Sequence, residues 1–287
     1  MFPASDTDAY RRWRDQKLEN LPRSLDELTV EIRDLGNLSE NEIAALNAAL
    51  KRANMAIYSS PTFTAQSDDK ALIRSLGARF GLQRLDHNMG ADEDAITSLS
   101  VQPDALHRHY IPYTDRPIAW HTDGYYNDRD HQIHALLLHC VHPADEGGAN
   151  QLLDHEMAYI QLYEQSPDYI QALMHPQAMT IPANKVDGQV IRPERTGPVF
   201  RITESGRLHM RYTDRKRSIR WRQEDLTQAA VQALKDILHS ASPYIFKGRL
   251  QPGQGLISRN VLHTRTAFKD GNPGRLIYRA RYIDEIH

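Results

Sequence analysis

Residues 275–282 read Arg-Leu-Ile-Tyr-Arg-Ala-Arg-Tyr, with arginine at three of the four odd-numbered positions and apolar or aromatic side chains at the others. Successive side chains of a β-strand point to opposite faces, so this pattern predicts a strand with Arg275, Arg279 and Arg281 on one face. Arginine is rarely buried unless it is paired. A row of guanidinium groups on one strand face therefore indicates a site for carboxylates or other anions. The planar guanidinium group binds such anions through two parallel N–H donors.

The alternative is that this face lies on the outside of the sheet, where each arginine is solvated or paired with a nearby acid. Asp284 and Glu285 follow the strand directly and are candidate partners. For Arg281 this second interpretation is preferred.

Similar short β-like stretches recur through the middle and the C-terminal third of the chain, separated by turn residues. They lie at 118–123, 133–141, 199–202, 207–212, 244–250, 255–258 and 275–283. Helical patterns lie at 39–54, 68–80, 154–164, 167–174 and 223–240. Many short strands with a few helices predict an α+β, mainly β protein built as an antiparallel sandwich or jelly roll. Neither an internal repeat nor a flexible linker divides the sequence, so a single domain over 1–287 is expected.

Length and composition are those of an ordinary globular protein. The 287 residues include 35 Lys+Arg and 37 Asp+Glu, a formal net charge of −2 that argues against a broad nucleic-acid surface. The single cysteine, Cys140, cannot form an internal disulfide, and residues 1–15 are charged where a signal peptide would be apolar, so a cytoplasmic location is expected. The longest apolar run, 133–141, is far shorter than the ~20 residues of a membrane span.

The residue types of a metal site occur at two places. Trp120-His121-Thr122-Asp123-Gly124 sits in a predicted strand, where residues i and i+2 present an imidazole and a carboxylate on the same face. His263 follows a short apolar strand much later in the chain. Two histidines and one carboxylate on one side of a metal leave other positions open, as in non-haem Fe(II) oxygenases. The alternative for an isolated His-x-Asp is a hydrogen-bonded pair on a surface strand.

The pattern His121-x-Asp123, then His263, then Arg275 and Arg279, resembles the taurine dioxygenase (TauD/TfdA) family of Fe(II)/2-oxoglutarate-dependent oxygenases. The resemblance covers most of the chain. It implies a double-stranded β-helix, a distorted jelly roll, with flanking helices. It also implies that His121, Asp123 and His263 bind Fe(II), that Arg275 binds the distal carboxylate of 2-oxoglutarate, and that Arg279 lines an adjoining anion site shared with the substrate.

One position departs from the family. Its members usually carry Thr after a Gly-Gly turn to hydrogen-bond the co-substrate, whereas this chain has Asn150. The Asn150 amide can donate the same hydrogen bond, and an ordinary turn asparagine is the alternative. The carboxylate at Asp123 argues against a halogenating relative, in which chloride takes the place of that ligand.

Other segments supply candidates for substrate contacts. Tyr125 and Tyr126 follow Asp123 and are expected in the pocket wall or in the core. The basic stretch 211–222 has two interpretations: contact with nucleic acid, or a solvated strand and turn with Arg211 or Arg215 near an anionic substrate. Residues 177–196 lack periodicity and are expected to form a long loop, either a lid over the iron or an ordinary surface loop.

Together these observations predict a dioxygenase that uses Fe(II), 2-oxoglutarate and O₂ and releases succinate and CO₂. The expected reaction is oxidation, most simply hydroxylation, of an unactivated C–H bond in a small anionic metabolite. A nucleic-acid or membrane partner is not expected, and a homo-oligomer is compatible with the sequence. Two alternatives stay open: a cupin-like metal enzyme that does not use 2-oxoglutarate, and a non-enzymatic binding module.

Overall fold

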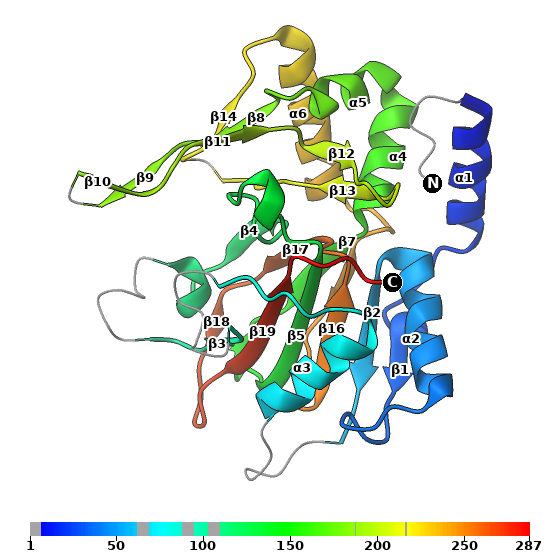
Figure 1. Ribbon diagram of the computed structural model, residues 1–287, viewed down its shortest axis with the longest axis vertical. Coiled ribbons are helices and arrows are strands. Elements are labelled where there is room, and N and C mark those ends of the chain that lie inside the picture. The colour runs from blue at the N-terminus through cyan, green and yellow to red at the C-terminus, as the bar shows by residue number, and fades with distance from the viewer. Residues whose placement is uncertain (1–6, 62–68, 88–94, 103–109, 187, 216) are drawn as a thin grey trace. The chain divides into compact units, whose positions relative to one another are not determined.

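The computed structural model describes residues 7–61, 69–87, 95–102, 110–186, 188–215 and 217–287 (Figure 1). They form two compact units, each assembled from three separate segments of the chain. Unit 1 contains the residues up to Leu21, Ala119–Gln132 and Leu153–Ile245, and unit 2 contains Pro22–Ile118, Ile133–Leu152 and Phe246–His287. The expectation of a single domain over 1–287 stays a prediction.

The largest sheet lies in unit 2 and has six strands in the order β1-β2-β16-β5-β19-β3. These strands are β1 (Thr29–Glu31), β2 (Met55–Ser59), β3 (Thr97–Leu99), β5 (Ala135–His142), β16 (Gln254–Ser258) and β19 (Leu276–Tyr282). Strands β1 and β2 run parallel, and the other neighbours are antiparallel. Every residue of β5 from Ala135 to Cys140 is buried, which means that both faces of the sheet are covered there. The strands predicted at 133–141, 255–258 and 275–283 are confirmed to within two residues.

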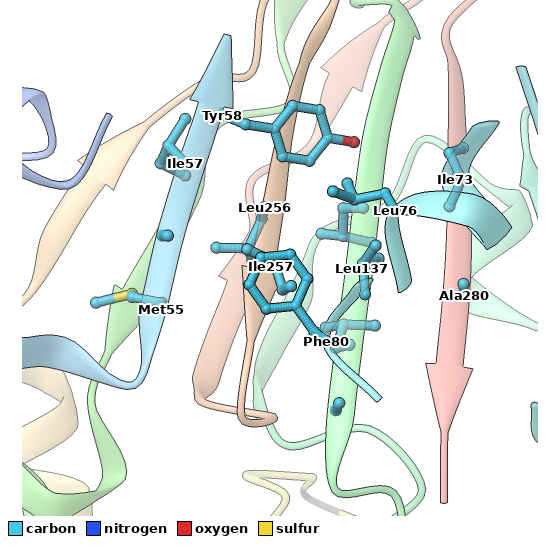
Figure 2. Close-up of a cluster of buried hydrophobic side chains, with 14 of the residues drawn as sticks. Met55, Ile57, Tyr58, Ile73, Leu76, Phe80, Leu137, Leu256, Ile257 and Ala280 are labelled. Carbon is cyan, nitrogen blue, oxygen red and sulfur yellow. The ribbon is translucent and has the colours of Figure 1, made fainter. Parts of the chain in front are cut away.

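Two helices pack on this sheet and form the core of unit 2: α2 (Glu40–Ala53) and α3 (Asp69–Arg79). Figure 2 shows Ile73 and Leu76 of α3, followed by Phe80, among apolar side chains of the sheet such as Leu137 and Ala280. Helix α2 begins with the predicted capping box. The Ser39 side chain accepts a hydrogen bond from the Glu42 backbone N–H, and the Glu42 carboxylate accepts one from the Ser39 N–H.

A second sheet has four strands in the order β15-β7-β17-β4. They are β4 (Ile118–His121), β7 (Asn150–Leu153), β15 (Phe246–Gly248) and β17 (Leu262–Arg265). A short antiparallel pair, β6 (Glu146–Gly147) and β18 (Phe268–Lys269), lies before β7 and after β17 in the chain. Gly147 has φ of 73°, and a Cβ there would lie 2.2 Å from the Ala267 carbonyl oxygen, so this position requires glycine.

Unit 1 contains four α-helices in its described residues and several short strands. The helices are α1 (Thr7–Glu19), α4 (His155–Gln165), α5 (Pro167–Met174) and α6 (Asp225–His239). The strands are β8 (Met179–Ile181), β9 (Asn184–Val186), β10 (Gln189–Arg192), β11 (Arg195–Gly197), β12 (Phe200–Ile202), β13 (Leu208–Met210) and β14 (Arg220–Trp221). Short 3-10 helices occur across the chain at η1 (Asp26–Leu28), η3 (Ile111–Tyr113) and η4 (Arg129–His131). No helix in the described residues combines the length and the hydropathy of a membrane span.

The expectation of a long loop over 177–196 is wrong. Strand β8 is the centre of a three-stranded sheet, paired with β11 on one side and β14 on the other. Strands β9 and β10 form an antiparallel hairpin, seen as the extended pair in Figure 1. These strands are only three or four residues long and lack a clear alternation, so their pairing depends on partners elsewhere in the chain. Their suggested role as a lid stays a prediction.

Helix α1 is attached to α4 through buried charges. The Nζ atom of Lys17 lies 2.6 Å from a carboxylate oxygen of Asp154 and 2.6 Å from one of Glu156. Lys17 is 7% exposed. Burial lowers the pKa of Lys17, but the two carboxylates outweigh that effect and raise it. The ammonium group therefore stays charged and holds the first helix against the start of α4.

Replacement of Lys17 with alanine leaves two carboxylates close together without their cation. We expect the free energy of unfolding to fall by about 3–5 kcal/mol, because the two carboxylates remain buried without a compensating positive charge. Urea denaturation measures the change. Arg11→Ala is the matched control in the same helix, since the Arg11–Asp8 pair is exposed and contributes at most about 1 kcal/mol. Equal losses in the two variants would contradict this prediction.

Candidate metal centre and anion site

His121 and Asp123 lie where strand β4 gives way to a turn. His121 is the last residue of β4, and Asp123 is already in the turn, where Gly124 has φ of 66°. The expectation that both residues belong to one strand over 118–123 is therefore wrong. The two side chains nevertheless converge, with His121 Nε2 3.8 Å from Asp123 Oδ1. That separation exceeds a hydrogen bond and suits two atoms that bind the same ion.

Both candidate histidines are held in the same way. His121 Nδ1 lies 2.9 Å from the Ala119 carbonyl oxygen, and His263 Nδ1 lies 2.9 Å from the Val261 carbonyl oxygen. A carbonyl oxygen can only accept, so each Nδ1 carries the hydrogen. In a neutral imidazole held this way the lone pair is at Nε2, and this is the form that binds a metal.

The structure places His121, Asp123 and His263 in one group. One candidate ligand atom from each residue lies within 4.8 Å of the others. His263 belongs to β17, and both His263 and Asp123 are buried. Two imidazoles and one carboxylate match the donor set of mononuclear non-haem iron sites.

Arg275 lies just before β19 in unit 2 and is 7% exposed. Its guanidinium carbon is 5.1 Å from the ring centre of Phe268. Within the described residues its Nη1 atom has no hydrogen-bond partner, and no carboxylate forms an ion pair with the group. Burial lowers the pKa of Arg275, while Cys140 and Asp270 act in the opposite direction. A buried cation of this kind is typical of an anion-binding site.

A second buried arginine, Arg265, was not singled out from the sequence. It ends β17, and its guanidinium carbon lies 4.9 Å from the ring centre of Phe268, the same ring that Arg275 contacts. It donates to backbone carbonyls of the segment 111–116, including those of Thr114 at 2.6 Å and Pro112 at 3.2 Å. Burial, and then the charge of Arg275, lower the pKa of Arg265 to about 9. Its position two residues after His263, in an apolar segment, is the signal that could have identified it.

The two arginines within β19, Arg279 and Arg281, are also buried. Arg279 lies opposite Leu138 of β5 and Thr97 of β3, and its expected role in an anion site stays a prediction. Arg281 is 2% exposed and forms an ion pair with Asp86. The preferred interpretation of Arg281 is thus right about pairing but wrong about the surface and about the partner.

The remaining candidates have these surroundings. Asn150 Nδ2 donates to the Thr264 carbonyl at 2.7 Å, so one amide hydrogen is used within the sheet and a contact with the co-substrate stays a prediction. The Arg211 guanidinium is buried and donates to three backbone carbonyls, those of Tyr125, Met179 and Arg195. The rings of Tyr125 and Tyr126 meet edge to face at 5.1 Å. A direct role of these residues toward substrate stays a prediction.

Solved structures that resemble this chain in fold include two non-haem iron oxygenases. The chain is similar to an asparagine oxygenase solved with Fe(II), 2S,3S-3-hydroxyasparagine and succinate, with a TM-score of 0.57 at 14% identity, covering 89% of this chain and 93% of that one. It is also similar to the non-heme iron oxygenase OrfP solved with Fe and alpha-ketoglutaric acid, with a TM-score of 0.60 at 16% identity, covering 86% and 81%. The chain belongs to the taurine catabolism dioxygenase TauD, TfdA family, whose family model matches residues 17–281. The resemblance noted in the sequence is thereby confirmed.

Two relatives share more sequence. The chain is 32% identical over 175 residues to a uridine-5'-phosphate dioxygenase from an Amycolatopsis species, over 58% of this chain and 60% of that protein. It is 29% identical over 196 residues to a uridine-5'-phosphate dioxygenase from a Streptomyces species, over 62% of this chain and 66% of that protein. The match thus spans less than two thirds of the length of each of these relatives.

Proposed function

We propose that this protein is an Fe(II)- and 2-oxoglutarate-dependent dioxygenase that oxidises a C–H bond of a small anionic metabolite. The observation that carries the proposal is the group formed by His121, Asp123 and His263, in which a backbone carbonyl accepts from Nδ1 of each histidine and leaves Nε2 for a metal. Family membership supports the same reaction class. When bound, iron and 2-oxoglutarate supply oxidative decarboxylation to succinate and CO₂, coupled to oxidation of the substrate by O₂.

The proposed architecture is a double-stranded β-helix. Its two sheets would be the six-stranded sheet around β5 and the four-stranded sheet β15-β7-β17-β4. Strand β17 holds His263 and Arg265, and Arg275 immediately precedes β19. Rigid strands hold such side chains more accurately than loops do.

The residues around Phe268 fit the co-substrate. Two guanidinium groups are buried there, and within the described part of the chain Arg275 Nη1 and Arg265 Nε have no hydrogen-bond partner. An uncompensated buried cation is costly, and a carboxylate that bonds to it removes that cost. Arg275 would bind the distal carboxylate of 2-oxoglutarate through two parallel hydrogen bonds from its guanidinium group. Arg265 would add positive charge and keep the segment 111–116 in place.

The protein's own part in the reaction is to orient the metal-binding histidines and the co-substrate. The backbone carbonyls of Ala119 and Val261 fix the tautomer and ring orientation of the two histidines, which keeps a lone pair available at each Nε2. The arginines hold the co-substrate in one orientation, which lowers the entropy cost of bringing the reactants together. Asn150 is a further proposed contact, through the amide hydrogen that Thr264 does not use.

An oxygen-uptake assay tests the proposal. The purified protein is supplied with Fe(II), 2-oxoglutarate and a panel of small anionic metabolites that includes uridine 5'-phosphate, and succinate is measured alongside O₂. We expect O₂ consumption and succinate release that both require Fe(II) and 2-oxoglutarate. Turnover that is unchanged when 2-oxoglutarate is omitted would support the cupin-like alternative. A protein that consumes no O₂ but binds RNA tightly would support the binding module.

A further inference from the structure

A cluster of arginines in unit 1 surrounds the two tyrosines that follow Asp123. Arg211 Nε donates to the Tyr125 carbonyl at 2.6 Å, and Arg215 Nη1 donates to the Tyr125 hydroxyl at 2.9 Å. The Arg192 guanidinium carbon lies 5.7 Å from the ring centre of Tyr126. The arginine cluster, as we call Arg192, Arg211 and Arg215, thus converges on one short segment of the chain.

The charge of this cluster is not balanced by acids in the described residues. No described carboxylate lies within ion-pair distance of any of the three guanidinium groups, and the acids nearby in sequence pair with other residues. Asp128 pairs with Arg195 and His131, Glu194 with Arg220, and Asp214 with His239. Burial lowers the pKa of both Arg192 and Arg211. Tyr125 and Tyr126 act in the opposite direction on Arg192, whereas Arg215 and Arg195 lower its pKa further, and Arg192 does the same to Arg211.

The three arginines differ in what they can offer a ligand. Arg211 is buried, and its guanidinium is held by three backbone carbonyls, so it contributes charge and holds the segment in place. Arg192 is half-buried and donates from its two terminal nitrogens to the carbonyls of Pro193 and Pro182. Arg215 is exposed, and Tyr125 is its hydrogen-bond partner in the described structure, so most of its donors face solvent. Arg211 and Arg192 therefore supply positive charge at fixed positions, and Arg215 supplies N–H donors that a ligand can use.

We propose that the arginine cluster is the subsite for a phosphate monoester group of the substrate. This inference rests on the proposed function and names its substrate class. A phosphate monoester carries nearly two negative charges and three peripheral oxygens at neutral pH, which suits several guanidinium groups better than a single carboxylate does. The subsite is built from residues of unit 1 alone, whereas the arginines assigned to 2-oxoglutarate belong to unit 2. The relatives named for uridine-5'-phosphate agree with a phosphorylated substrate.

Calorimetry with matched ligand pairs tests this subsite. Uridine 5'-phosphate is compared with uridine, and ribose 5-phosphate with ribose, in the presence of 2-oxoglutarate. We expect the wild type to bind at least one phosphate ester about tenfold or more tighter than its dephosphorylated partner. Arg215→Gln and Arg192→Gln should each remove most of that difference and leave binding of the dephosphorylated partner unchanged. Arg220→Gln is the matched control, because Arg220 is exposed and already paired with Glu194.

Three results would overturn the proposal. One is a wild type with no preference for either phosphate ester. Another is a preference that survives in both Arg215→Gln and Arg192→Gln. The third is a preference that disappears in Arg279→Gln but not in Arg215→Gln, which would assign the phosphate to β19. Failure of the proposed function has a different signature, since O₂ uptake would then be independent of 2-oxoglutarate whatever the phosphate preference.

Discussion

Asp123→Ala is expected to abolish Fe(II)- and 2-oxoglutarate-dependent turnover and to weaken metal binding by about 100-fold or more. Changes to residues that only support metal ligands already cost 10–100-fold, so the loss of a ligand should cost at least as much. The carboxylate is also the one anionic member of the group, and its removal leaves two neutral imidazoles. Titration of the protein with Fe(II) or Co(II) under anaerobic conditions measures this effect without relying on activity.

The fold should survive this change, because Asp123 lies in a turn after β4 and not in either core sheet. Circular dichroism and urea denaturation check that point. Asp130→Ala is the matched control, an exposed acid a few residues further along the chain. If Asp123→Ala kept wild-type turnover and metal affinity, the proposed metal centre would be wrong.

Arg275→Gln is expected to lower the affinity for 2-oxoglutarate at least tenfold. A buried carboxylate that loses its bidentate partner loses about 2–5 kcal/mol, and each 1.4 kcal/mol is a factor of ten. Arg275→Lys should recover only part of the affinity, because a point charge does not reproduce the planar fork. The apparent KM for 2-oxoglutarate and its dissociation constant by calorimetry both measure the loss.

The same substitution should not destabilise the protein when no ligand is present. Arg275 is a buried cation whose Nη1 has no partner among the described residues, so its replacement by a neutral side chain removes a desolvation penalty. We therefore expect an unchanged or higher melting temperature together with weaker 2-oxoglutarate binding. Lys269→Gln, an exposed change in nearby β18, should alter neither quantity. An unchanged affinity in Arg275→Gln would refute the assigned role.

Local signals in the sequence were sufficient for the elements that depend on near neighbours. The start of α2 was predictable because Ser39 and Glu42 satisfy each other's backbone groups within one turn. Strands β5 and β19 were predictable because their side chains carry the pattern of buried strands along the chain. Family membership was also predictable, since two histidines and an acid in this order resemble a family to which the chain belongs, while their role as metal ligands stays a prediction.

Other features depended on partners too distant in sequence to be foreseen. The strands within 177–196 exist because β8 pairs with β11 and with β14, and a three-residue strand has no stability of its own. Arg281 is buried because Asp86, almost 200 residues earlier, neutralises it. The charge pattern of a strand shows that a buried arginine needs a partner of opposite charge, but not which residue provides it.

The identity and order of His121, Asp123, His263 and Arg275 are thus enough to indicate the kind of chemistry. The electrostatics around these residues depend on tertiary contacts. These contacts put Arg265 beside Arg275 on the ring of Phe268, and they gather three arginines around Tyr125 and Tyr126. The physical reason is that residue types and spacing specify which atoms can act as donors, whereas burial and long-range contacts decide which charges remain for a ligand to neutralise.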